Sequence, residues 1–138
     1  MRLARVLAEH RAPDRPAIRI ARGDALPLGE RDLDWPQFVW AVQADGLGGW
    51  APASLFDAQR GPATALADYD TLELDADAGQ LLRLREELAQ WWWARDARGR
   101  EGWIPARALE LLDRTAARAI DDDFPESNIQ ESLGTNRQ

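Results

Sequence analysis

The clearest hydrophobic pattern along this chain is a pair of short aromatic-rich runs, which is typical of β-strands. Residues 38–42 and 91–95 are aromatic-rich runs, and each is followed by a glycine-containing turn and then by a Trp-x-Pro sequence. Each run therefore predicts one arm of a β-hairpin whose second arm ends at a proline.

Residues 80–90 are ambiguous when they are taken alone. Leu81, Leu84 and Leu88 lie at helical spacing among good helix formers, which favours a helix. The corresponding segment earlier in the chain, residues 24–30, contains a proline and a glycine that would interrupt a helix. Because two copies of one ancestral segment share one structure, we predict a strand for both.

An internal repeat underlies that comparison. Residues 38–57 align without a gap with residues 91–110, and two tryptophans, two glycines and a proline are among the identities. Further upstream the pairing continues with small shifts, in that residues 18–23 match 74–79 and residues 6–10 match 65–69. The polar segment 57–62 ends in Gly-Pro, which is a turn signal. The repeat therefore predicts two small domains, over residues 1–58 and 63–112.

Residues 113–138 differ from both copies. The arginine and alanine content of residues 113–120 favours a short helix or a linker, and residues 121–138 are acidic with few apolar side chains. We predict a disordered tail there, with the alternative that Phe124 and Ile129 dock on one of the two domains.

Composition narrows the function classes. The 138 residues include 24 acidic and 17 basic ones, so the net charge is −7, which argues against nucleic acid as the partner. No apolar run approaches the ~20 residues of a membrane-spanning helix. The chain has no cysteine and a single histidine, His10, so we expect no catalytic residues, no cofactor and no metal site. The charged first ten residues contain no secretory apolar stretch, which predicts a cytoplasmic location.

Residues 65–112 resemble a Src homology 3 (SH3) domain. Four segments carry the resemblance in the family's order: ALADYD (65–70), ELDADAGQLLRL (73–84), WWWAR (91–95) and GREGWIPARALEL (99–111). The first copy resembles a divergent member of the family, most closely in GLGGWAPASLF (46–56). The resemblance implies an all-β protein made of two tandem small SH3-like β-barrels with a disordered C-terminal tail.

The resemblance also implies a peptide-binding groove. In the second copy Tyr69, Trp91 and Pro105 fall on groove positions of the family, and in the first copy Phe38 and Pro52 do so. Acidic side chains flank the second groove and would pair with a basic residue of a ligand; they are Asp75, Asp77 and Glu87. Alanines replace two tyrosines of the family's groove, at Ala67 and Ala108, so we expect weak binding of ordinary PxxP peptides.

These expectations describe a noncatalytic protein-interaction module, an adaptor or docking protein that binds an extended or basic peptide segment through an aromatic groove. The alternative is a structural or regulatory subunit whose barrel faces are closed by packing between domains or between copies. The expected partner is a protein or peptide, with weak self-association, and neither nucleic acid nor a membrane.

Overall fold

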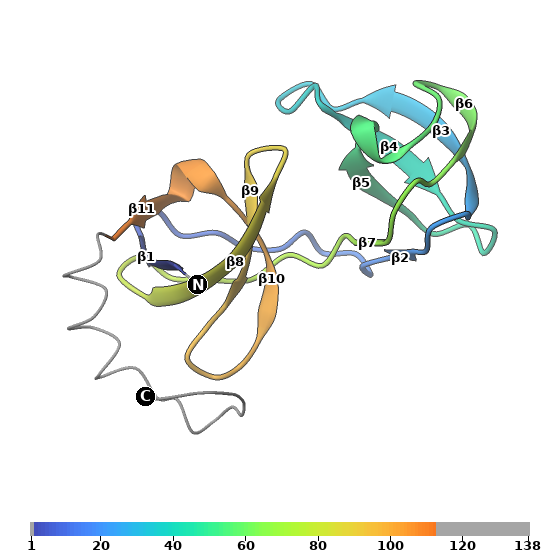
Figure 1. Ribbon diagram of the computed structural model, residues 1–138. Coiled ribbons are helices and arrows are strands. Elements are labelled where there is room, and N and C mark those ends of the chain that lie inside the picture. The colour runs from blue at the N-terminus through green and yellow to red at the C-terminus, as the bar shows by residue number, and fades with distance from the viewer. Residues whose placement is uncertain (1, 113–138) are drawn as a thin grey trace. The chain divides into compact units, whose positions relative to one another are not determined.

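The computed structural model describes residues 2–112, and this part of the chain is all-β (Figure 1). The strands in chain order are β1 (Arg2–Val6), β2 (Arg19–Ile20), β3 (Ala25–Arg31), β4 (Phe38–Val42), β5 (Gly48–Pro52), β6 (Gly61–Thr64), β7 (Tyr69–Asp70), β8 (Leu81–Leu88), β9 (Trp91–Arg95), β10 (Glu101–Pro105) and β11 (Leu109–Leu111). Single turns of 3₁₀ helix, Ala53–Leu55 and Ala106–Ala108, follow the prolines that end β5 and β10. The predicted helix at 113–120 and the predicted tail lie outside the described residues.

The predicted strands are confirmed. Strands β4 and β9 occupy the two aromatic-rich runs, and each pairs with the next strand as a hairpin. The ambiguous segment 80–90 forms strand β8, and its counterpart forms β3. In β8 Leu82 and Leu84 are buried while Arg85 is exposed, so alternation across a sheet determines this segment despite its helical spacing.

Two compact units make up the described chain, and their bounds differ from the predicted domains 1–58 and 63–112. One, which we call the discontinuous unit, takes residues 2–12 and 73–112. The other, the continuous unit, takes residues 13–72. The difference arises because β1 joins the sheet of β8 rather than that of β3, which lies nearer in sequence.

The discontinuous unit is built on a five-stranded antiparallel sheet in the order β10-β9-β8-β1-β11. Strand β1 lies between β8 and β11, so Ala4 faces Leu82 on one side and Leu111 on the other. Its buried core combines residues from both ends of the chain; it comprises Ala4, Val6, Leu74, Ala76, Leu82, Leu84, Ala94, Ile104, Ala108 and Leu109.

The continuous unit holds a four-stranded sheet in the order β5-β4-β3-β6 and a two-stranded ribbon of β2 and β7. Strand β6 pairs with β3, where Ala63 lies opposite Leu26. Tyr69 of β7 lies opposite Ile20 of β2. In each unit, therefore, a strand that is distant in sequence pairs with the outer strand of a hairpin sheet. This strand is β1, paired with β8, in the discontinuous unit and β6, paired with β3, in the continuous unit. Within residues 2–112 no helix is long and apolar enough to cross a membrane.

Candidate functional site

Trp91 and Pro105 lie directly opposite each other where β9 and β10 pair, in the discontinuous unit. Trp91 is half-buried and Pro105 is buried. Strand geometry turns Trp91 and Trp93 to one face and Trp92 to the other, where Trp92 packs against the core of the unit. The three successive tryptophans are each only partly buried, so indole surface remains accessible on both faces.

His10 is an aromatic neighbour of Trp91. The two ring centroids are 5.5 Å apart with an interplanar angle of 78°, which is an edge-to-face contact. The Nε2 atom of His10 lies 2.9 Å from Oε1 of Glu73, and both side chains are about four-fifths buried. The backbone of His10 exchanges two hydrogen bonds of 2.9 Å with Ala76, which holds the backbone at this position.

A glycine keeps Glu73 beside this histidine. The N–H of Leu74 donates to the carbonyl of Trp103 at 2.9 Å, so residues 73 and 74 run alongside β10. A Cβ atom on Gly102 would lie 2.7 Å from the backbone of Glu73 and Leu74, closer than real Cβ atoms approach. Glycine at this position therefore permits the close approach that places the Glu73 carboxylate within reach of His10.

The predicted acidic flank is largely occupied by the chain itself. Asp77 accepts a hydrogen bond from Arg11, and this bond raises the pKa of Arg11 above its usual value. Arg11 also donates to the carbonyl of Ala76 at 3.0 Å. Asp75 accepts the backbone N–H of Ala12 at 2.7 Å. These two carboxylates hold the segment after β1 in place, and their role beside a ligand stays a prediction.

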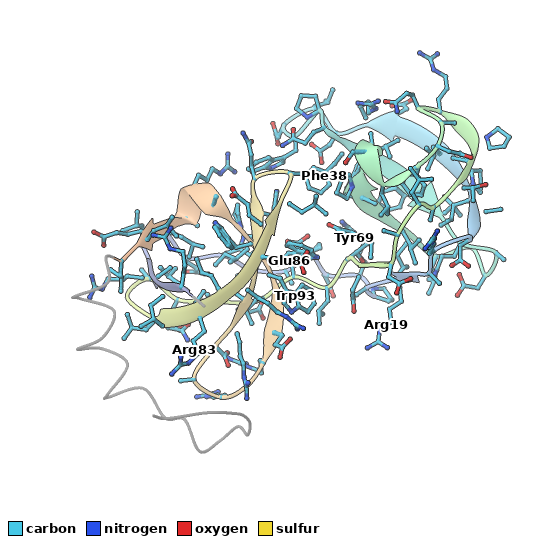
Figure 2. The ribbon with its side chains drawn as sticks, viewed as in Figure 1. Arg19, Phe38, Tyr69, Arg83, Glu86 and Trp93 are labelled. Atoms are coloured by element: carbon cyan, nitrogen blue, oxygen red, sulfur yellow. The ribbon has the colours of Figure 1, made fainter. Side chains whose placement is uncertain are left out.

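Glu87, the third carboxylate of the predicted flank, and its neighbour Glu86 remain exposed beside the tryptophans. Glu86 lies opposite Trp93 and Glu87 lies opposite Trp92 in the pairing of β8 with β9. Figure 2 labels Glu86 and Trp93, which come together from these adjacent strands. Trp93 also donates its indole N–H to Glu101 at 2.8 Å.

The continuous unit contains the remaining predicted site residues. Phe38 lies opposite Pro52 where β4 and β5 pair, and both are buried. Tyr69 is buried in this unit as well, on β7, and Figure 2 labels it together with Phe38. Tyr69 thus belongs to a different unit from Trp91 and Pro105, so their predicted grouping in one groove stays a prediction.

Sequence reasoning gave His10 no role at this surface. The usable signal was the match of residues 6–10 with 65–69, which places His10 at the position of Tyr69. That match marks His10 as a ring position, but it does not say which tryptophan or phenylalanine the ring will face.

Within residues 2–112 no group of three or more acidic or histidine side chains is arranged to hold a metal ion. Comparisons with protein-family models, with curated proteins and with solved structures found no match to this chain.

Proposed function

We propose that this protein is a noncatalytic interaction module that binds an extended peptide segment of a partner protein at the surface around Trp91, His10 and Pro105. The observation that carries the proposal is the difference between the two units. Trp91 keeps accessible ring surface, whereas its counterpart Phe38 and the nearby predicted residues Pro52 and Tyr69 are all buried. Partly accessible, well-packed aromatic side chains are the usual anchors of protein interfaces.

The chemistry of this surface favours a ligand with both apolar and basic side chains. An edge-to-face pair of rings beside a proline suits the apolar ridge of an extended or polyproline II peptide. Glu86 is exposed on the adjacent strand opposite Trp93, which shares a face with Trp91, and the net charge of −7 adds a favourable field for a basic peptide.

We further propose that each unit is a variant of the SH3 barrel. Support comes from the four sequence segments that resemble the family and from a feature that the units share: a hairpin ends in a buried proline, and a single 3₁₀ turn follows it. The burial of Phe38, Pro52 and Tyr69 favours a structural role for the continuous unit, so we assign peptide binding to the discontinuous unit.

The test is a titration of the full chain with a basic proline-rich peptide, followed by the indole N–H signals in NMR spectra. We expect shifts at Trp91 and its neighbours that weaken as salt is added, since exposed charge pairs are screened. Trp91→Ala should weaken binding by about 2 kcal/mol, as expected for an aromatic anchor. Trp40→Ala, which removes a partly exposed tryptophan of the continuous unit, is the matched control and should leave affinity unchanged. Shifts confined to the continuous unit, or none at all, would refute the assignment.

A further inference from the structure

The two units repeat one pattern of strand pairing with the strands supplied crosswise. Arg5 of β1 lies opposite Leu81 of β8. In the internal alignment Arg5 corresponds to Thr64 and Leu81 corresponds to Ala25, and Thr64 of β6 does lie opposite Ala25 of β3. Each first strand thus occupies the same register on the sheet of the other copy.

Backbone hydrogen bonds around the first strands follow the same rule. Val6 donates to the carbonyl of Gln80 at 2.9 Å, and its counterpart Ala65 donates to Asp24 at 2.9 Å. One residue further on, the pattern continues, because Leu7 donates to Ala108 at 2.7 Å and its counterpart Leu66 donates to Leu55 at 2.8 Å. The same slot is therefore filled in both units, by the strand of the opposite copy.

We propose that the two copies have exchanged their first strands reciprocally within one chain, and that side-chain size holds the exchange in place. The copy that begins the chain gives β1 to the sheet of β8 and receives β6 on the sheet of β3. This arrangement accounts for the discontinuous unit, which takes its first strand from one copy and its remaining strands from the other.

The size argument rests on one position in each slot. Val6 lies opposite Leu109 in the discontinuous unit, and all but 1% and 8% of their surfaces are buried. Its counterpart Ala65 lies opposite Phe56 in the continuous unit, with 2% and 4% exposed. A larger strand residue thus meets the smaller partner, and a smaller one meets the larger partner.

Without exchange the sizes would not match. Val6 would face Phe56 and crowd it, while Ala65 would face Leu109 and leave a void. Protein interiors tolerate neither overpacking nor cavities well. Side-chain volume therefore selects the exchanged pairing, although the backbone pattern alone would accept either first strand in either slot.

The exchange also determines the composition of the candidate site. His10 follows β1 and Tyr69 follows β6, so each ring is carried to the sheet of the opposite copy. Trp91 therefore has His10 from the first copy as an edge-to-face neighbour, and Glu73 lies beside that histidine.

Cysteine cross-linking tests the proposal directly, because the chain has no cysteine of its own. The hydrogen bond from Val6 to Gln80 makes Arg5 and Leu81 a non-hydrogen-bonded pair, and such pairs place Cα atoms at a distance that a disulfide can span. We expect the variants R5C/L81C and A25C/T64C of the full chain to form disulfides within one chain under mild oxidation. The matched controls T64C/L81C and R5C/A25C should not, since they join strands that pair only without exchange.

All four positions lie outside the buried core, so the variants test pairing rather than folding. Cross-linking of the control pairs in place of the expected pairs would overturn the exchange. Disulfides between chains instead of within one would show that strands exchange in an oligomer, which also overturns the proposal. Equal cross-linking of all four pairs would refute selection by side-chain size.

A second set of variants tests the size rule itself. Val6→Ala combined with Ala65→Val interchanges the two side chains, so the unexchanged pairing now has the matched volumes. In this background we expect T64C/L81C to gain at least tenfold in disulfide formation over the same pair with Val6 and Ala65 in place. No gain would show that something other than these side chains fixes the exchange.

Discussion

Asp96 is the only charged side chain that is buried among residues 2–112. One carboxylate oxygen accepts the backbone N–H groups of Arg98 and Arg100, each at 2.9 Å, and the other accepts Nε of Arg100 at 2.9 Å. These hydrogen bonds stabilise the turn between β9 and β10. The buried charge is thus compensated by donors that the turn would otherwise leave without partners.

Replacing this side chain should cost stability because the donors lose their acceptor. We expect Asp96→Ala to lower the free energy of unfolding by about 2 kcal/mol, the usual cost of unmaking buried hydrogen bonds to a charge. Asp45→Ala is the matched control, since Asp45 is exposed and accepts one backbone N–H, from Leu47, in the turn between β4 and β5. Urea unfolding measures both variants, and an equal loss in the two would contradict the special role of Asp96.

The turn between β8 and β9 has a strained backbone that its residue types do not predict. Ala89 and Gln90 have positive φ angles of 52° and 71°, a conformation that two-residue hairpin turns require and that asparagine or glycine normally supplies. The turn keeps this shape although neither residue favours it. Strand pairing on both sides, where Leu88 lies opposite Trp91, therefore determines the turn.

Relieving this strain should stabilise the hairpin. We expect Ala89→Gly to raise the free energy of unfolding by about 1 kcal/mol, because glycine adopts positive φ without a clash. Ala97→Gly is the control, since Ala97 lies in the next hairpin turn without a positive φ, and it should stabilise nothing. Thermal unfolding of the two variants measures the effect. A melting temperature of Ala89→Gly below that of the unchanged protein would contradict the backbone strain at Ala89.

Strands were predictable from the sequence where local pattern decides them. The runs at 38–42 and 91–95 form strands because their aromatic residues fit a half-buried sheet, and Pro27 rules out a helix in one copy and hence in the other. The pairing partner of β1 was not predictable in this way. Both first strands are short, and each fits a slot of the same register, so the choice depends on contacts between residues far apart in the chain.

The same limit applies to the candidate site. Trp91, Pro105, Phe38 and Pro52 were placed correctly in pairs because each pair lies within one hairpin. Tyr69 precedes its expected sheet by more than ten residues, and that connection is where the chain passes to the other unit. Local sequence order therefore predicts contacts within a hairpin better than contacts across a crossover.

At the level of the whole chain, the exchange means that the sequence copies and the folding units contain different residues. The continuous unit, residues 13–72, contains every strand of its own sheets. The second sequence copy, residues 63–112, lacks β1, which lies in the discontinuous sheet between β8 and β11. A fragment with the bounds of a structural unit should therefore fold, whereas a fragment with the bounds of a sequence copy should not.

We expect a fragment of residues 13–72 to fold cooperatively, since its core and backbone hydrogen bonds are complete within it. A fragment of residues 61–112, which is the second copy with all of β6, should fail to fold cooperatively, because a strand ending at Ala65 would leave a void at the place of Val6. Adding a peptide of residues 1–12 to a fragment of residues 13–112 should restore the near-ultraviolet signal of the tryptophans around β9. The roles of the fragments would be reversed, with 61–112 stable and 13–72 unfolded, if each copy used its own first strand. Recovery on addition of the 1–12 peptide, and none with a peptide of the same composition in scrambled order, would show that β1 alone completes the discontinuous unit.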